Sequence, residues 1–383
     1  MTSFAMSACG LPAAEMEAAR WLVHVLTAGF SSPNGRAFLI PLIMHDQILR
    51  ERDITVRIFE EDSPAVTDCD ILVVDSKFHS PRWAAESEAV LSDYAGYKER
   101  VGKVILVDIL DSTGFDHVRQ LPYVTLHCKA QLLRDRRAYL KPLYAYRPYA
   151  DYYHREFAVT DDEPVWSEPI ARESDLDKMT VGWNSALADY SWLGPYRMAA
   201  YRKVPMRTLL QFPESFFPPD SPRPQSVSCR IGTGYKSRAV AYQRREMASR
   251  LKGRIDVGKV SRYRYLRELR RSKIGLSPFG LGEITLRDFE IFLSGAALLK
   301  ADMSAIETWP DLYRDGETMT AHKWDLSDLE EKIDSLLSDS PRRHEIAEAG
   351  QVQYRKYLSG PDAGALFADH FESILKKCES LAA

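Results

Sequence analysis

Short apolar runs alternate with helical patterns along most of this chain, and this alternation restricts its fold more than any other feature. Residues 21–27, 54–59, 71–75, 103–109 and 123–127 have the pattern of short buried strands. Helical patterns such as residues 83–100 lie between several of them. Such alternation is typical of βαβ units, whose strands join into a mostly parallel sheet. We therefore predict an α/β fold.

The alternation restarts after a proline-rich segment. Five prolines lie between Phe212 and Gln225, and proline suits neither a helix interior nor a central strand. Beyond them, strand patterns cover residues 226–231, 254–257 and 273–277. At roughly 150 residues per domain, the 383-residue chain is long enough for two. We predict two Rossmann-like domains that face a cleft, at residues 1–210 and 211–360, and a C-terminal helix at 361–383.

The overall composition excludes several classes of protein. A formal charge of −3 gives no support for a nucleic-acid partner. Five scattered cysteines without paired spacing are typical of free thiols in a reducing compartment. The longest early apolar run, residues 21–30, is too short to span a bilayer. We expect a cytoplasmic protein without an integral membrane segment. The Asp-x-Asp pairs at 68–70 and 175–177 fit solvated charges or helix caps, so we predict no metal site.

A glycine-rich turn stands between a predicted strand and a predicted helix. It contains Gly232, Gly234, Lys236 and Arg238. Backbone N–H groups at such a turn, together with a helix N-terminus and two cations, can hold a phosphate. Asp256 follows Gly234 by 22 residues, which imitates the dinucleotide-binding fingerprint. An NAD(P)-dependent oxidoreductase therefore stays open as an alternative.

A second candidate site lies in residues 277–300. Glu283, Arg287 and Glu290 are spaced by four and three residues, so on a continuous helix they share one face. In open parallel sheets, ligands bind beyond the carboxyl ends of the strands. A charged helix face at that edge predicts a ligand site. The basic helix predicted at 263–271 is interpreted as a solvated face, with contact to anionic lipid as the alternative.

Candidate general bases follow the strand predicted at 103–109. Asp111 and His117 lie in the loop beyond it. A carboxylate or imidazole at the cleft edge can take a proton from an acceptor hydroxyl. Asp111 is the preferred candidate, because its loop combines a strand end, small residues and further acidic groups.

Residues 227–323 resemble the GT-B glycosyltransferases, and most closely their spore-maturation-protein-like branch. The turn GTGYKSR and the segment RDFEIFLSGAALLK carry the resemblance. It implies that Glu290 accepts hydrogen bonds from the ribose of a nucleotide-sugar donor. It also implies that Gly232, Gly234, Lys236, Arg238 and Arg287 face the diphosphate, and that Pro278 and Gly280 lie beside the nucleobase. Retaining members commonly carry two glutamates separated by seven residues, whereas here Glu283 and Glu290 are separated by six.

The resemblance implies a glycosyltransferase of GT-B architecture whose C-terminal helix packs back across both domains. Its donor is a nucleotide sugar, and its acceptor is a glycan or lipid-linked hydroxyl, with bacterial surface polysaccharide as the expected product. The nucleotide sugar is a substrate, so no cofactor and no metal are expected. Peripheral membrane contact stays open. A non-catalytic nucleotide- or glycan-binding module is the remaining alternative.

Overall fold

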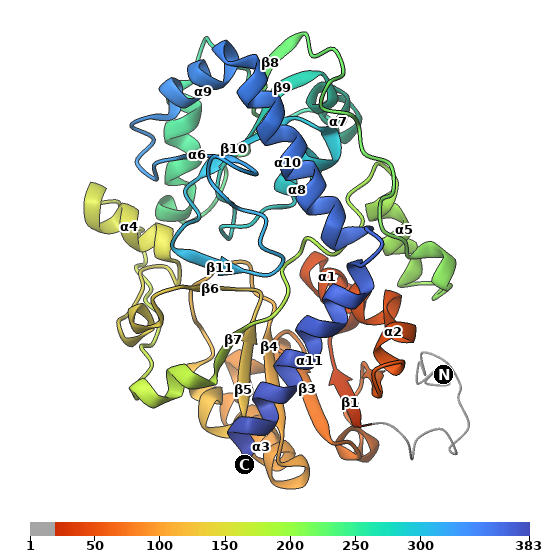
Figure 1. Ribbon diagram of the computed structural model, residues 1–383. Coiled ribbons are helices and arrows are strands. Elements are labelled where there is room, and N and C mark those ends of the chain that lie inside the picture. Colours follow the sequence, from red (N-terminus) through yellow and green to blue (C-terminus); the bar gives the residue numbers. More distant parts are fainter. Residues whose placement is uncertain (1–19) are drawn as a thin grey trace.

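The computed structural model describes residues 20–383, which form two α/β units joined along one side by the last two helices (Figure 1). The first unit contains a six-stranded parallel sheet. Its strands, in spatial order, are β2 (Ile54–Phe59), β1 (Trp21–Leu26), β3 (Ile71–Asp75), β4 (Val104–Asp108), β5 (Leu126–Lys129) and β7 (Met179–Val181). Every residue of β3 and β4 is buried. This explains the runs of four apolar residues before the final aspartate of each strand, because helices cover both faces of the sheet.

The helices of the first unit lie between its strands or follow them. They are α1 (Pro33–Met44), α2 (Asp46–Arg50), α3 (Ser80–Val101), α4 (Pro148–Phe157) and α5 (Gly194–Tyr201). The chain turns at His45, which ends α1 and precedes the first residue of α2.

The second unit contains a four-stranded parallel sheet. Its strands, in spatial order, are β12 (Thr320–His322), β10 (Ala297–Ala301), β9 (Ser272–Ser277) and β8 (Gln225–Ser228). Its helices are α6 (Arg238–Arg250), α7 (Arg262–Arg271), α8 (Leu286–Ser294), α9 (Leu329–Ser338) and α10 (Ser340–Leu358). The fold class predicted from the sequence, α/β with two Rossmann-like units, is confirmed. The predicted domain boundary at 210/211 stays a proposal that falls between the two sets of strands.

One predicted strand is wrong. Residues 254–257 are not a strand, because the backbone N–H groups of Arg254 and Ile255 both bond back to the carbonyl of Leu251 at the end of α6. The chain therefore turns tightly after the helix, and beyond this turn the Val257 carbonyl accepts a hydrogen bond from Ile231 N at 3.1 Å, just past the end of β8. Within residues 20–383, no helix is long and apolar enough to cross a bilayer.

The two units meet through a loop of the second unit that enters the first. Glu283 is fully buried, and its carboxylate accepts hydrogen bonds from Thr113 N (2.8 Å), Ser112 Oγ (3.0 Å) and Gln131 Nε2 (3.3 Å). Beside it, Gly282 lies so close to the backbone of Asp111 that a Cβ atom would overlap with the Asp111 carbonyl. This contact positions the ends of the two sheets relative to each other.

A two-stranded antiparallel ribbon makes a second link, in which β6 (Gln131–Leu133) of the first unit pairs with β11 (Ile306–Thr308) of the second. The C-terminal helix α11 (Ala363–Ala382) makes a third, because it packs back on α2 and β5. On α11, His370 Nε2 lies 2.9 Å from the carbonyl oxygen of Gly182, and its ring stacks on Trp309 at 4.1 Å.

Gly282→Ala is expected to destabilise the protein by about 1–3 kcal/mol, because the new methyl group overpacks the contact between the units. Urea unfolding of the full chain measures this change. Gly234→Ala is the matched control, since a Cβ there meets no atom within 4 Å. Equal stability of both variants would contradict the close approach at Gly282.

Stability is also expected to fall on acidification through His370. Burial lowers the pKa of His370 from 6.5 to about 4. The folded protein thus binds this proton more weakly than the unfolded chain does, so its contribution is present above pH 6.5 and is lost as the pH falls towards 4. Urea unfolding between pH 7 and about 4.5 should show a shallower pH dependence for His370→Gln than for the parent chain. An equally steep pH dependence in His370→Gln and the parent chain would contradict this contribution.

Candidate functional site

A pocket of about 340 Å³ lies beyond the carboxyl end of β8 in the second unit. This volume is within the range of roughly 300–1,000 Å³ that is usual for small-molecule sites. We call it the basic pocket, because four cations and one carboxylate line it. Its lining residues are Arg230, Gly232, Lys259, Val260, Arg262, Tyr265, Arg287 and Glu290. The loop after β8, the start of α7 and one face of α8 supply them, at the edge where parallel sheets bind ligands.

Glu290 is the carboxylate of the basic pocket. It belongs to α8, whose apolar residues Phe289, Ile291 and Phe292 are buried in the core of the unit. Its side chain is 8% exposed and forms an ion pair with Arg262 of α7. Burial raises the pKa of Glu290, and the neighbouring Arg262 and Arg287 oppose this rise.

The arginines of the pocket retain unused hydrogen-bond donors. Arg287 donates one hydrogen bond to the carbonyl of Arg230, and its guanidinium lies 5.9 Å from the centre of the Tyr265 ring. Arg287 Nε and Nη1 and Arg262 Nε are buried and make no hydrogen bond with any residue of the described chain. Buried donors without acceptors are costly. The pocket therefore suits a ligand that is rich in acceptor oxygens.

Arg230 is a cation of the pocket that two carboxylates from outside the pocket already neutralise. It pairs with Glu268 at 2.7 Å and with Asp256 at 2.6 Å. Asp256 was the acidic residue of the pattern that resembles the dinucleotide-binding fingerprint. In the structure it is an exposed partner of Arg230 and does not lie at the end of a strand. This removes the structural basis for the oxidoreductase alternative, in which the acidic residue stands at the end of the second strand.

The N-terminus of α6 was predicted to bind phosphate, but a carboxylate of the first unit, that of Asp161, lies there instead. Ser237 Oγ donates to Asp161 Oδ2 at 2.8 Å, and the backbone N–H groups of Arg238 and Ala239 donate to Asp161 Oδ1. The Arg238 side chain pairs with Asp162 at 2.6 Å. A helix N-terminus favours an anion, and here a carboxylate takes that place.

As a result, the residues predicted to bind phosphate do not all lie at one site. Gly232 lines the basic pocket, whereas Gly234, Lys236 and Arg238 are not among its lining residues. Of the residues expected to bind the diphosphate and the ribose, the structure thus brings together Gly232, Arg287 and Glu290.

Glu283 does not share the helix face of Arg287 and Glu290, which corrects the predicted continuous helix. The helix α8 starts at Leu286, with Thr285 and Asp288 forming a capping box at its N-terminus. The preceding loop, which includes Pro278 and Gly280, is held by the first unit: Tyr149 Oη donates to the carbonyl of Gly280 at 2.8 Å. Neither Pro278 nor Gly280 lines the basic pocket.

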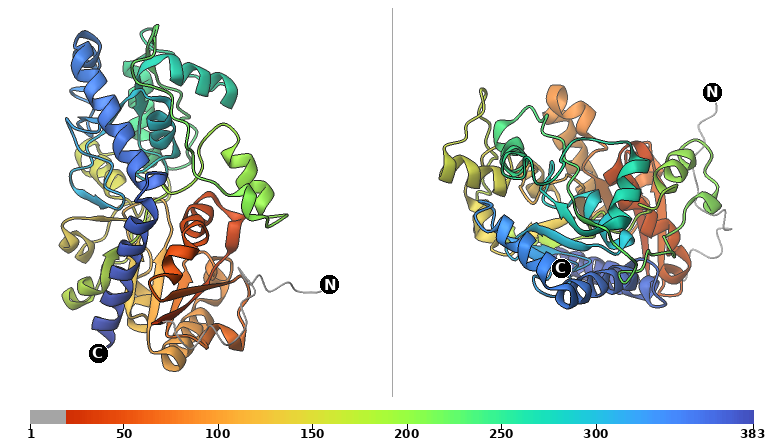
Figure 2. Two further views of the ribbon diagram at one scale, coloured as in Figure 1. Left: turned by 45° about the vertical axis from the view of Figure 1, so that its right-hand side comes forward. Right: turned by 90° about the horizontal axis from the view of Figure 1, so that it is seen from above.

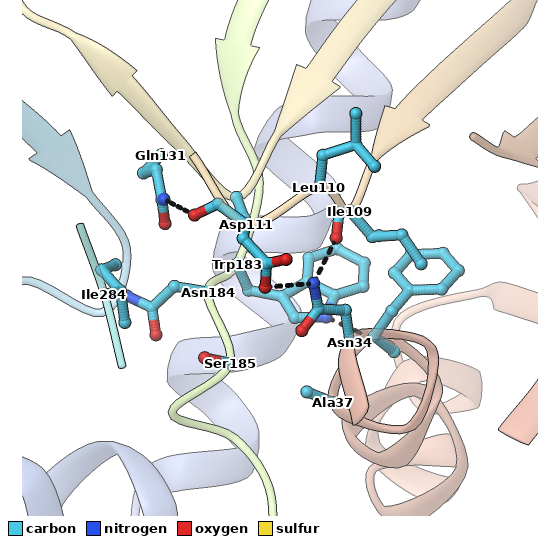
Figure 3. Close-up of a pocket in the computed structure, with 12 residues that line it drawn as sticks. Asn34, Ala37, Ile109, Leu110, Asp111, Gln131, Trp183, Asn184, Ser185 and Ile284 are labelled. Carbon is cyan, nitrogen blue, oxygen red and sulfur yellow. Dashed lines mark hydrogen bonds between the residues drawn. The ribbon is translucent and has the colours of Figure 1, made fainter. Parts of the chain in front are cut away.

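Asp111 lies at a smaller cavity between the two units (Figure 3). Its volume is about 30 Å³, which is space for only a few water molecules. Asn34 Nδ2 donates to Asp111 Oδ1 at 3.0 Å and to the carbonyl of Ile109 at 2.7 Å. Ile284 of the second unit completes the lining. The arrangement orients the Asp111 carboxylate at the junction of the units.

His117 is separate from this cavity. Its Nε2 lies 3.7 Å from Asp108 Oδ1, and Asp108 forms a fully buried ion pair with Lys129 at 2.5 Å. Burial alone would raise the pKa of Asp108, but Lys129, His117 and His127 together hold it well below its usual value. The two predicted bases, Asp111 and His117, are therefore not brought together around one cavity.

Five residues of the basic pocket were not predicted from the sequence: Arg230, Lys259, Val260, Arg262 and Tyr265. All except Arg230 come from α7 and the residues just before it, and α7 was interpreted as a solvated basic face. The signal that could have identified them is the density of cations, since seven lysines and arginines lie between residues 259 and 273.

Comparisons with known proteins bear on the second unit. Residues 231–360, about a third of the chain, match the model of a protein family described as glycosyl transferase-like. This segment includes Gly232, Arg262, Arg287 and Glu290 of the basic pocket. The chain matches none of the curated proteins.

Solved structures with a similar outline include Anabaena HepE in complex with UDP-glucose, with a TM-score of 0.42 and 9% identity over 92% of this chain and 100% of that one. A glycosyltransferase from Rickettsia africae has a TM-score of 0.41 and 12% identity, over 93% and 98% of the two chains. The sucrose-phosphate synthase from Thermosynechococcus elongatus has a TM-score of 0.40 and 9% identity, over 93% and 100%. At these values the likeness transfers no property to this chain.

Asp161→Ala is expected to lower the free energy of unfolding by about 1–2 kcal/mol, because three donors at the start of α6 lose their acceptor. Thermal and urea unfolding measure the loss. Asp162→Ala is the matched control: its ion pair with Arg238 is exposed, so its removal should change stability by less than about 1 kcal/mol. If both changes had the same effect, the special role of Asp161 would be refuted.

Proposed function

We propose that this protein is a glycosyltransferase that moves a sugar from a nucleotide-sugar donor to a hydroxyl acceptor. The observation that carries the proposal is the basic pocket: a buried carboxylate and arginines with unused donors, within the segment that matches a glycosyl transferase-like family. The two-unit architecture agrees with the GT-B resemblance of residues 227–323.

In this proposal, Glu290 binds the ribose of the donor and the cations of the pocket bind its diphosphate. A carboxylate can accept hydrogen bonds from both hydroxyls of a ribose cis-diol, and Glu290 faces the pocket from α8. In this proposal Arg262, Arg287 and Lys259, which line the pocket, donate to the diphosphate oxygens. Guanidinium and ammonium groups both form charge-assisted hydrogen bonds with phosphate. Lys236 and Arg238 could join only if the start of α6 exchanged Asp161 for the diphosphate.

Transfer requires the departing diphosphate to be stabilised as negative charge develops on it. Fixed cations in a site that excludes water serve this purpose well, because they need no reorganisation during the reaction. We infer that the cations of the pocket make a metal ion unnecessary, and that the nucleotide sugar acts as substrate without a further cofactor.

The acceptor is proposed to bind between the units, where Asp111 would remove a proton from its hydroxyl. The present cavity beside Asp111 is smaller than a sugar ring. Acceptor binding therefore requires the two units to separate near the Glu283 contact. A glycan or lipid-linked acceptor, a hexosyl donor, a role in bacterial surface polysaccharide, a cytoplasmic location and membership of the spore-maturation-protein-like branch belong to this proposal as its finer parts.

Calorimetry with UDP, GDP and CMP, and turnover assays with a panel of their sugar derivatives, test the proposal. Glu290→Gln and Arg287→Ala are each expected to weaken binding of the cognate nucleotide by about 10- to 100-fold, the usual effect of losing a charge-assisted hydrogen bond in a buried site. The matched controls are Glu331→Gln and Arg245→Ala, which change exposed residues of the same unit outside the pocket.

The outcomes separate the alternatives. Normal binding and turnover in Glu290→Gln, Arg287→Ala would refute the site. Binding without transfer to any acceptor would support a non-catalytic nucleotide-binding module. Thermal stabilisation by NAD(H) but by none of the nucleoside diphosphates would support the oxidoreductase alternative.

A further inference from the structure

The segment from Trp192 to Met206 exposes a cluster of large apolar side chains. Thirteen such side chains are exposed within residues 20–383, and five of them fall in this short segment. They are Trp192 (38% exposed), Leu193 (51%), Tyr196 (61%), Val204 (52%) and Met206 (52%). A sixth, Tyr263 of α7, is 57% exposed, and its ring lies 5.5 Å from that of Trp192. Single exposed apolar residues need no explanation, but a gathering of six does.

The backbone of this segment stands at the outer edge of the molecule (Figure 2). The helix α5 is anchored to the first unit through Met198 and Tyr201, and the Tyr201 ring packs on Phe30 at 4.8 Å. Its other side, with Tyr196, Ala199 and Ala200, faces away from the protein. The segment therefore offers its apolar residues to something outside the chain.

The same surface is strongly basic. The chain has a formal charge of −3, yet residues 190–213 contain four cations and no carboxylate, and residues 259–273 contain seven cations and one carboxylate. Of the first four cations, Arg197 is paired with Asp189, just before the range, and the other three form no ion pair with any residue from 20 to 383. The one carboxylate of the second range, Glu268, is paired with Arg230. By contrast, Arg264, Arg267 and Arg271 are exposed on α7 and form no ion pair with any residue of the described chain.

We propose that this surface binds an anionic lipid bilayer. We call it the docking face, defined as residues 192–207 together with the exposed side of α7. Tryptophan and tyrosine favour the interface between headgroups and acyl chains, and aliphatic side chains enter the outer part of the acyl region. The surrounding arginines and lysines are attracted to anionic headgroups. The docking face combines these three elements on one side of the molecule.

A lipid surface explains the docking face better than a nucleic acid does. A phosphodiester backbone would attract the cations, and bases could stack on Trp192 or Tyr263. Neither would bury Leu193, Val204 and Met206, which gain free energy only by leaving water for an apolar phase. The aliphatic residues thus favour the bilayer.

The docking face adjoins the basic pocket. Arg262, which pairs with Glu290, is the neighbour of Tyr263 on α7 and also donates to the carbonyls of Tyr190 and Ser191. A bilayer on the docking face would therefore lie close to the pocket. This inference does not depend on the proposed function, because membrane binding can be measured in the absence of any donor or acceptor.

Co-sedimentation of the full chain with vesicles tests the proposal. Vesicles of phosphatidylcholine are compared with vesicles that also contain phosphatidylglycerol, at low and high salt. Binding is expected only with the anionic vesicles and should weaken as salt screens the cations. The double change Arg264→Glu, Arg267→Glu is expected to weaken this binding at least tenfold, and Trp192→Ser, Leu193→Ser several-fold.

Matched controls place the same chemical changes elsewhere on the second unit. Arg245→Glu, Lys252→Glu reverses two exposed cations on α6 and just after it, and Val352→Ser removes an apolar side chain that is 62% exposed. Both should bind vesicles as the parent chain does. Thermal unfolding of every variant verifies that the fold is retained.

Three results would overturn the proposal. The first is the absence of binding to anionic vesicles. The second is equal loss of binding in the control variants, which would indicate a general charge effect. The third is unchanged vesicle binding by the Trp192→Ser, Leu193→Ser variant together with full competition by duplex DNA, which would indicate a polyanion site without bilayer insertion.

Discussion

The buried carboxylate of Glu283 is the contact on which the arrangement of the two units depends. Glu283 lies in the loop just before α8 of the second unit, and its carboxylate accepts three hydrogen bonds from residues of the first unit. A charge removed from water is tolerated only where such donors satisfy it, so the contact is specific in position as well as in partner. Gly282 allows the backbones to approach closely enough for it to form. The same loop leads directly into the helix that carries Arg287 and Glu290.

Electrostatics divides the cations of the second unit into three groups. Those at the start of α6 are matched by Asp161 and Asp162 of the first unit. In the basic pocket, Arg262 pairs with the buried Glu290, and both Arg262 and Arg287 keep unused donors. Those on the outer side of α7 face solvent beside exposed aromatic and aliphatic residues. One basic helix thus serves both the pocket and the outer surface, which explains why its charge exceeds what a solvated helix needs.

Part of the candidate site could be predicted from local sequence. Glu290 and Arg287 lie one turn apart on a single helix, and Gly232 lies in the loop after β8, so their positions depend on short-range geometry. Lys259, Arg262 and Tyr265 enter the pocket only because α7 packs beside α8, which no local pattern reveals. The place of Arg238 outside the pocket depends on Asp161 and Asp162, which lie 77 and 76 residues earlier in the chain.

The sequence by itself determined the α/β class, the restart after the prolines and most of the strands, because the periodicity of apolar residues follows directly from burial on helices and sheets. It also determined that Glu290 and Arg287 share a face. Only the tertiary structure decided that Glu283 is buried against the first unit and that Asp161 lies at the N-terminus of α6. It also decided that the apolar side chains of residues 192–207 are exposed beside α7. Each of these depends on contacts or exposure between segments far apart in the chain, where hydrogen-bond donors and acceptors find partners that local sequence does not specify.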